Sequence, residues 1–143
     1  MRATFPVTVH LLFFQDNSVL LLRRFNTGFE DGNYSVPAGH LDGGETVRTA
    51  AVREALEEVG VRIEIPDVEF ATVMHRKSDD ERVDFFVRIK QWAGEPYNAE
   101  PEKCDELSWW DLDALPENII PYVDTAIKNY REGVPFNEFG WQR

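Results

Sequence analysis

Apolar residues occur in short runs that are separated by polar turns. Residues 7–14 and 19–22 are two such runs around one turn, a pattern typical of a β-hairpin. Residues 70–76 and 83–90 have the same pattern around a second polar turn and are predicted to be another pair of strands. A further short strand is expected at 107–110.

Two segments have the pattern of helices. Thr46 is a suitable N-cap and Gly60 a suitable stop, so a helix is predicted over residues 47–59. Residues 119–130 are predicted to form a second helix that ends before Gly133. Strands, a helix, strands and a helix in this order indicate the α+β class with a mixed sheet.

The first helix has two different faces when its residues are placed at about 100° intervals. One arc is apolar and is expected to be buried; it contains Ala51, Val52, Ala55, Leu56 and Val59. The other arc is expected to be exposed and contains Arg53, Glu54, Glu57 and Glu58. Like charges four residues apart weaken a helix. Either solvent screens this repulsion, with Arg53 paired to Glu57, or a cation removes it.

Composition limits the classes of protein that remain. The chain has 143 residues, 43% hydrophobic and 29% charged, which is typical of one globular domain spanning 1–143. No apolar run is long enough to span a bilayer, and the start lacks the apolar stretch of a secretion signal. Cys104 is the single cysteine, so no intrachain disulfide is expected and a reducing, cytoplasmic setting is favoured.

The formal net charge of −11 argues against binding to a nucleic-acid polymer, which requires a basic surface. A phosphate ligand would therefore need metal ions and a few placed arginines. Carboxylates at positions i, i+3 and i+4 of a helix supply the hard oxygen ligands that Mg²⁺ or Mn²⁺ prefers. The loop before the helix contains Gly39, Gly43 and Gly44, and these glycines permit backbone conformations that turn polar groups inward.

The segment from Gly39 to Val61 resembles the Nudix box, G-x5-E-x7-R-E-U-x-E-E-x-G-U, where U is a bulky aliphatic residue. Every fixed polar and glycine position of that box is matched, from Gly39 and Glu45 to the run Arg53-Glu54-Ala55-Leu56-Glu57-Glu58-Val59-Gly60-Val61. Ala55 departs from the pattern, as a small residue at an aliphatic position. The preceding Val36-Pro37-Ala38-Gly39 resembles the Pro-Gly-Gly segment of these enzymes, with Ala38 in place of the first glycine. The order of elements resembles the Nudix α/β/α sandwich with a mixed β-sheet.

This resemblance implies a hydrolase that cleaves the diphosphate linkage of nucleoside diphosphate derivatives with a divalent metal, Mg²⁺ or Mn²⁺. Glu57 and Glu58 would be the main metal ligands, with the Ala38 carbonyl as a backbone ligand. Glu54 would complete the metal set or act as the catalytic base, two alternatives that the sequence leaves open. Arg53 would orient the glutamates, and Glu45 would contact Arg53 or a metal-bound water.

Outside the box, the resemblance implies further site residues. An arginine at the end of the second strand touches substrate phosphate in MutT-like enzymes, and Arg24 has better register for this than Arg23. A later loop brings an extra metal-ligating glutamate, with Glu100 preferred to Glu102. Residues expected near the substrate also include Gly39 and, as part of a base pocket, Phe25, Tyr34 and the Asn118 region. His40 and His75 are expected to be structural, because Mg²⁺ prefers oxygen.

The substrate class is predicted mainly from absences. Subfamilies that act on ADP-ribose or dinucleoside polyphosphates often have a proline or a tyrosine after the box, and residues 67–95 contain neither. The expected reaction is therefore cleavage of a (deoxy)nucleoside triphosphate to monophosphate and pyrophosphate, with a small-molecule nucleotide as partner. The alternatives are hydrolysis of ADP-ribose or a nucleotide sugar, a non-catalytic nucleotide sensor, and diphosphate isomerisation. The tail, with Phe136, Phe139 and Trp141, is expected to pack on the body or on a partner chain in a homodimer.

Overall fold

The computed structural model of the protein describes residues 1–142. The strands are β1 (Val7–Gln15), β2 (Ser18–Arg24), β3 (Tyr34–Ser35), β4 (Ala38–His40), β5 (Val68–Lys77), β6 (Glu81–Ile89), β7 (Cys104–Asp111) and β8 (Phe136–Phe139). The helices are α1 (Val47–Val59), the 3-10 helix η1 (Ile65–Asp67) and α2 (Pro121–Glu132).

The strands form one mixed sheet in the order β3-β2-β1-β6-β5-β8, while β4 pairs with β1 and β7 with β2. The β1–β6 and β5–β8 pairs are parallel, and the other pairs are antiparallel. Strand β1 is therefore central: at residues 8–10 it has β4 on one edge and β6 on the other.

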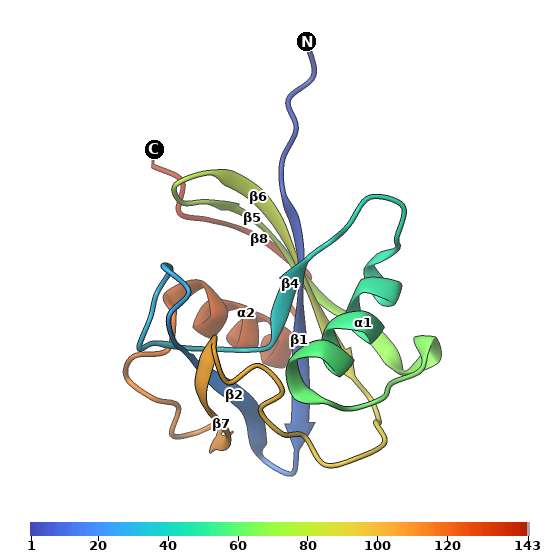
Figure 1. Cartoon of the computed structure of the whole chain (residues 1–143). Coiled ribbons are helices and arrows are strands. Elements are labelled where there is room, and N and C mark those ends of the chain that lie inside the picture. Colours follow the sequence, from blue (N-terminus) through green and yellow to red (C-terminus); the bar gives the residue numbers. More distant parts are fainter. Residues whose placement is uncertain (143) are drawn as a thin grey trace.

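Successive side chains of a strand point to opposite faces, and β1 shows how this divides the core. Val9, Leu11 and Phe13 pack with α1, whereas Leu12 packs with α2. The two helices thus cover opposite faces of the sheet (Figure 1). By the same alternation, the polar residues Thr8 and His10 belong to the face that α2 covers.

The predicted hairpin, strand pair and first helix are confirmed, and α1 spans the predicted residues between Thr46 and Gly60. The second helix is displaced by two residues, and β7 is longer than predicted. Strands β3, β4 and β8 and the helix η1 were not predicted.

The tail packs on the body of its own chain. Strand β8 pairs with β5, and the Trp141 indole N–H donates to the His75 carbonyl at 3.0 Å. Of the two predicted arrangements, packing on the body is therefore confirmed for Phe139 and Trp141. The backbone of Phe136 pairs with β5 while its side chain is half-exposed, and a homodimer stays a prediction.

The predicted division of α1 into a buried and an exposed face is partly wrong. Leu56, expected in the core, is 53% exposed, and Glu54, expected on the exposed arc, is only 7% exposed. The reason is that α1 packs against β4 as well as against β1, so its buried arc is rotated to include Ala50 and Glu54. Periodicity alone cannot show this second contact.

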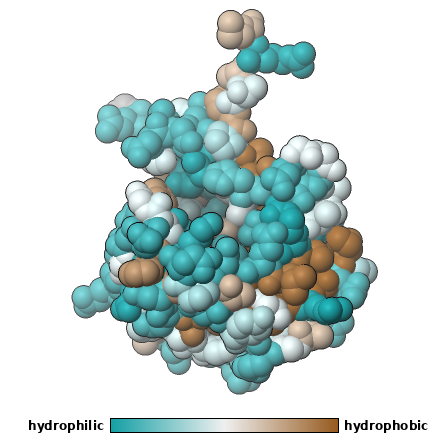
Figure 2. All heavy atoms as spheres, in the orientation of Figure 1, coloured by the Kyte–Doolittle hydropathy of each residue, from teal (hydrophilic) through white to brown (hydrophobic). Residues whose placement is uncertain are grey.

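The surface is mostly hydrophilic, as the net charge implies, and Figure 2 shows apolar surface near α1 and η1. Exposed apolar side chains there include Leu56 and Ile65. Within residues 1–142, no helix is long and apolar enough to cross a membrane.

Candidate active site

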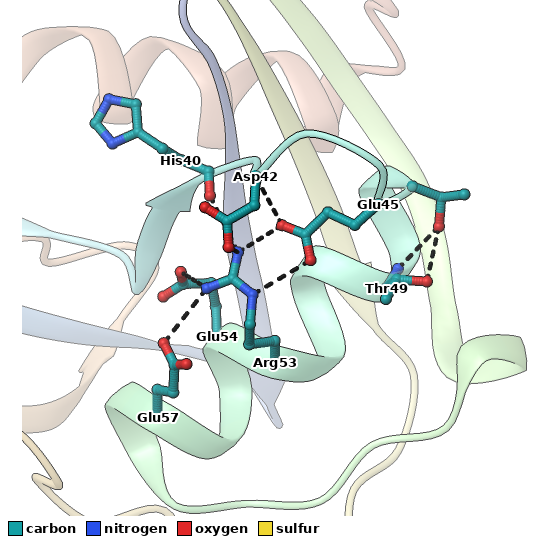
Figure 3. A network of polar contacts seen from close by, with 8 residues as sticks. His40, Asp42, Glu45, Thr49, Arg53, Glu54 and Glu57 are labelled. Carbon is teal, nitrogen blue, oxygen red and sulfur yellow. Dashed lines mark hydrogen bonds and ion pairs between the residues drawn. The ribbon is translucent and has the colours of Figure 1, made fainter.

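The turn before α1 is joined to the helix by the Arg53 guanidinium (Figure 3). Arg53 Nη2 donates to Glu45 Oε1 at 2.6 Å and to the His40 carbonyl at 3.1 Å, and Nε donates to Glu45 Oε2 at 3.2 Å. Glu45 also accepts a bond from the Asp42 backbone N–H at 2.8 Å. The hydrogen bonds from Arg53 and Asp42 lower the pKa of Glu45. The expected Glu45–Arg53 contact is therefore present.

Glu54 is buried against a glycine. A Cβ atom at Gly39 would overlap the Glu54 carboxylate, so a larger residue here would displace this carboxylate from its position. Arg53 Nη1 donates to the same Oε1 at 2.7 Å. Burial raises the pKa of Glu54 despite the contacts from Arg53, and the charges of Glu57 and Glu100 add to the rise. The absence of a side chain at Gly39 thus allows the Glu54 carboxylate to occupy this position.

Glu57 and Glu58 are one residue apart but differ in environment. Glu58 is partly buried and accepts a bond from the Ala38 backbone N–H at 2.7 Å. Burial raises the pKa of Glu58 well above its usual range, and the Glu54 charge raises it further. Glu57 is exposed, with Arg53 Nη1 3.4 Å from its Oε2. The loop before α1 therefore contacts Glu58 through its backbone.

The loop between β6 and β7 is joined to the C-terminal end of α1. The backbone N–H groups of Tyr97 and Ala99 donate to the carbonyls of Val59 and Glu58, at 3.0 and 3.1 Å. The last carbonyls of a helix lack intrahelical partners, and this loop supplies them. The next residue, Glu100, is thereby placed at the cavity that contains Glu58. Glu102, the second choice from sequence, is exposed.

Arg24 and Arg23 end β2 side by side but have different partners. Arg24 Nε donates to the Phe29 carbonyl at 2.7 Å, Nη2 donates to Thr27 Oγ1 at 3.1 Å, and the guanidinium lies 5.3 Å from the Phe29 ring centroid. Arg23 Nε donates to Asp105 Oδ1 on β7 at 2.8 Å. Arg24 lines the cavity described next, and Arg23 is directed to β7.

One cavity of about 830 Å³ collects these groups. Four carboxylates line one part of it, and we call them the acidic wall: Glu54, Glu57, Glu58 and Glu100. Ala38, Gly39, Arg24 and Lys103 line the cavity as well. Of the site residues predicted from sequence, the cavity thus brings together Glu54, Glu57, Glu58, Glu100, Ala38, Gly39 and Arg24. Arg53 does not line the cavity but contacts Glu54 and Glu57. Other predicted residues lie outside its lining: Arg23, Phe25, Tyr34, Glu45 and Asn118.

The acidic wall fits a divalent cation in its chemistry. It offers hard oxygen ligands. Burial, and to a smaller extent the neighbouring carboxylates, raise the pKa of Glu54 and of Glu58, and a bound cation would favour the ionised form of both. Within residues 1–142, however, no three acidic, histidine or cysteine side chains surround one point as a metal ion requires. Arg53 holds both Glu54 and Glu57 in this arrangement. The carboxylate oxygens that a metal ion would need are therefore in the cavity, but within residues 1–142 they do not converge on one point.

A second part of the cavity, which sequence reasoning missed, is formed by the sheet and α2. We call Thr8, His10, Arg76 and Tyr122 the sheet-side wall. Asp84 on β6, completely buried, accepts hydrogen bonds from Thr8 and Arg76. The available signal was His10, which interrupts the apolar run of residues 7–14; Arg76 and Asp84 lie in strands that contain several other charged residues and so gave no such signal.

The remaining candidates lie elsewhere. Tyr34 packs in the core beneath α2, where its hydroxyl donates to Glu106 Oε1 at 3.0 Å. The Asn118 side chain donates to the Gly32 carbonyl at 2.8 Å, and Phe25 is 46% exposed on the loop after β2. His75 Nε2 lies 2.7 Å from Glu81 Oε2. Neither Tyr34 nor Asn118 lines the cavity, so this arrangement gives no support for a contact between either residue and the base of a nucleotide.

Comparison with known proteins decides the family. A sequence model of the NUDIX domain matches residues 4–130 of the chain. The chain belongs to the Nudix family. As a Nudix hydrolase, the protein is an enzyme that acts on nucleotide derivatives, and hydrolases of this family use divalent metals such as Mg²⁺. That one Nudix domain spans 1–143 stays a prediction, because the match ends at residue 130.

Individual Nudix relatives differ in their named substrates. An ADP-ribose pyrophosphatase of Methanocaldococcus jannaschii is 32% identical over 127 residues, which is 87% of this chain and 72% of that protein. The 8-oxo-dGTP diphosphatase of Escherichia coli is 26% identical over 108 residues, 76% of this chain and 83% of that protein. A crystal structure of a MutT NUDIX hydrolase from Burkholderia pseudomallei superposes with a TM-score of 0.81 at 26% identity, covering 88% of this chain and 98% of that one. The predicted Nudix α/β/α sandwich is confirmed.

Proposed function

We propose that this Nudix hydrolase cleaves a (deoxy)nucleoside triphosphate, standard or oxidised, to the monophosphate and pyrophosphate with Mg²⁺ or Mn²⁺. The observation that carries the proposal is that one cavity holds both the acidic wall and Arg24. A cavity of about 830 Å³ is in the range that buries one nucleotide-sized ligand.

Arg24 is suited to a phosphate because its charge is not consumed by a carboxylate. Its side-chain hydrogen bonds go to the Phe29 carbonyl and the Thr27 hydroxyl, both neutral. These two bonds fix the guanidinium while leaving further N–H donors for phosphate oxygens. Lys103 adds a second positive charge to the cavity lining. An acidic protein can thus attract a polyanion locally.

Metal binding is assigned to the acidic wall. Glu57, Glu58 and Glu100 would hold Mg²⁺ together with the Ala38 carbonyl, and Glu54 would either join them or remain free as a base. The bound ion would neutralise phosphate charge and acidify a water molecule. Because the carboxylates alone repel each other, binding the ion also removes a local cost in the folded protein.

Glu54 is the residue best placed to accept a proton from the attacking water. Its raised pKa makes it a better acceptor near neutral pH than an ordinary glutamate. Arg53 occupies only Oε1, which leaves Oε2 for this role. Arg53 acts as a positioning residue, since it holds Glu54 and Glu57 on the helix and Glu45 in the turn.

Hydrolysis of ADP-ribose is the second candidate. One observation favours it: the relative from M. jannaschii, 32% identical over 127 residues, is an ADP-ribose pyrophosphatase. Against it, residues 67–95 lack the proline that often marks that subfamily.

A substrate panel separates the two candidates. Triphosphates, ADP-ribose, nucleotide sugars and dinucleotides are compared at equal concentration with Mg²⁺, and the products are identified. We expect the highest kcat/KM for a triphosphate, with monophosphate and pyrophosphate as products. A kcat/KM for ADP-ribose or a nucleotide sugar roughly tenfold above every triphosphate, about 1.4 kcal/mol in transition-state binding, contradicts the triphosphate assignment.

A further inference from the structure

The sheet-side wall contains a rigidly held arginine. Arg76 is 4% exposed and lines the cavity. Its Nε donates to Asp84 Oδ2 at 2.6 Å and its Nη2 to Oδ1 at 3.3 Å, while the guanidinium carbon lies 3.7 Å from the Tyr122 ring centroid. Thr8 Oγ1 donates to Asp84 as well, at 2.5 Å. The Arg76 guanidinium is therefore held by Asp84 along one edge and by the Tyr122 ring against one face.

Arg76 keeps hydrogen-bond donors for a ligand. A guanidinium has five N–H groups, and the carboxylate of Asp84 takes the edge formed by Nε and Nη2. Within residues 1–142, the side-chain hydrogen bonds of Arg76 use Nε and Nη2, and none uses Nη1. The edge formed by Nη1 and Nη2 presents parallel N–H groups, a geometry that matches two adjacent acceptor atoms. Because Arg76 lines the cavity, this edge is available to a ligand or to water.

The charge balance of the sheet-side wall favours a neutral ligand group. Asp84 offsets the charge of Arg76, and Arg82 on the same cavity is paired with Asp80 at 2.7 Å. Burial lowers the pKa of His10 to about 4, so this imidazole is neutral near pH 7. A phosphate would find no net positive charge here. Arg24, by contrast, is bonded only to neutral groups, so the phosphates belong at Arg24 and an uncharged part of the substrate at Arg76.

Building on the proposed function, we propose that Arg76 recognises the base of the substrate through two adjacent acceptors, the O6 and N7 atoms of a 6-oxopurine such as guanine. Arginine pairs with these two atoms by parallel hydrogen bonds in nucleic-acid recognition. Adenine presents an amino donor beside N7. Among pyrimidines, cytosine has an acceptor pair of its own, O2 and N3, so binding of dCMP as tight as that of dGMP would overturn the choice of a 6-oxopurine. The substrate class is therefore 6-oxopurine nucleotides, and Arg76 determines that specificity.

The test uses nucleoside monophosphates that differ at the recognised atoms. Dissociation constants of dGMP, dAMP, dCMP and 7-deaza-dGMP, which lacks only N7, are measured without metal by tryptophan fluorescence. The wild-type protein is expected to bind dGMP about tenfold more tightly than dAMP and about fivefold more tightly than 7-deaza-dGMP. In Arg76→Lys, which keeps the charge but loses the fork, both ratios should fall to near one.

Arg88→Lys is the matched control. Arg88 lies on β6 and pairs with Glu69 across the same sheet, with 3.6 Å between Nη1 and Oε1. This control should keep both ratios. Equal wild-type binding of dGMP and 7-deaza-dGMP would overturn the proposal and needs no variant, so it decides even where Arg76→Lys fails to fold. Ratios retained in Arg76→Lys would make the Arg76–Asp84 pair structural only and would overturn it too.

The same panel distinguishes this inference from the proposed function. The kcat/KM values of dGTP, dATP and 7-deaza-dGTP are measured with Mg²⁺ for the same three proteins. Failure of the wild type to cleave any triphosphate refutes the triphosphate assignment alone, because the monophosphate ratios still decide the role of Arg76.

Discussion

The two walls of the cavity differ in charge: the acidic wall has an excess of negative charge, whereas the charges of the sheet-side wall are paired. The acidic wall gathers four carboxylates, of which Arg53 contacts Glu54 and Glu57. Burial raises the pKa of Glu54 and of Glu58. The sheet-side wall pairs Arg76 with Asp84 and keeps His10 neutral. The excess negative charge of the acidic wall attracts a cation, and it destabilises the folded protein when no metal is bound. The charges of the sheet-side wall cancel, so this wall can distinguish neutral ligand groups only by the geometry of their hydrogen bonds. One cavity thus separates binding of the reacting phosphates from selection of the substrate.

The largest expected effect comes from removing a carboxylate of the acidic wall. Glu57→Gln should lower Mg²⁺-dependent kcat/KM by about a thousandfold or more, roughly 4 kcal/mol, because the residue is a proposed main ligand. The fold should remain intact, since Glu57 is exposed. Glu132→Gln, an exposed glutamate of α2, is the control and should retain activity. Unchanged turnover of Glu57→Gln at saturating Mg²⁺ would remove Glu57 from the metal site.

Metal removal is the next largest effect. If the acidic wall binds Mg²⁺, a concentration one hundred times Kd should stabilise the protein by about 2.7 kcal/mol relative to EDTA. For a chain of this size, that corresponds to a rise in Tm of roughly 6–10 °C.

Glu58→Gln should abolish this rise. Without metal it should also be more stable than the wild type near neutral pH, because the folded-state pKa of Glu58 is raised and its ionised form destabilises the fold. A wild-type Tm that does not respond to Mg²⁺ would contradict the assignment.

The sheet-side wall should respond to pH through His10. Its pKa is lowered to about 4 in the folded protein, so between pH 4 and the unfolded value of about 6.5 the unfolded chain binds more protons. This residue's contribution to the free energy of unfolding should therefore fall by about 2 kcal/mol as the pH drops from 6.5 to 5. Denaturant unfolding at both pH values should show this loss in the wild type and not in His10→Gln. An equal loss in both proteins would mean that His10 does not titrate as inferred.

The smallest effect distinguishes the two loop glutamates. Glu100→Gln should lower kcat by about tenfold, roughly 1.4 kcal/mol, with a smaller change in substrate binding. Glu102→Gln, two residues away and exposed, should stay within about twofold of the wild type. The comparison uses kcat from steady-state kinetics and Kd from binding without turnover. An impaired Glu102→Gln beside a normal Glu100→Gln would reverse the assignment.

Local chemistry made part of the fold predictable. The Thr46 cap, the helical pattern and Gly60 belong to one continuous stretch of chain, so α1 was placed correctly from sequence. Turns between apolar runs defined the hairpins for the same reason. The motif from Gly39 to Val61 likewise identified the four box residues Arg53, Glu54, Glu57 and Glu58.

Long-range packing was not predictable from these patterns. Strands β3, β4 and β8 contain two to four residues each, and their pairing partners rather than their composition define them. The position of the Glu54 carboxylate depends on Gly39, fifteen positions earlier, and the place of Glu100 at the cavity depends on where a loop meets α1. Arg76 was missed because its partner Asp84 lies on the neighbouring strand.

The loop that follows β6 should unfold locally together with the C-terminal end of α1. Because the Tyr97 and Ala99 amides bond to the Val59 and Glu58 carbonyls, neither segment can open without breaking the hydrogen bonds of the other. Their amide protons should therefore exchange with solvent at a common rate, as one cooperative unit of local unfolding. Insertions that lengthen this loop before Tyr97 still allow both hydrogen bonds to form. A proline at position 99 has no backbone N–H, so it would remove the bond to the Glu58 carbonyl and make both Glu58 and Glu100 more mobile.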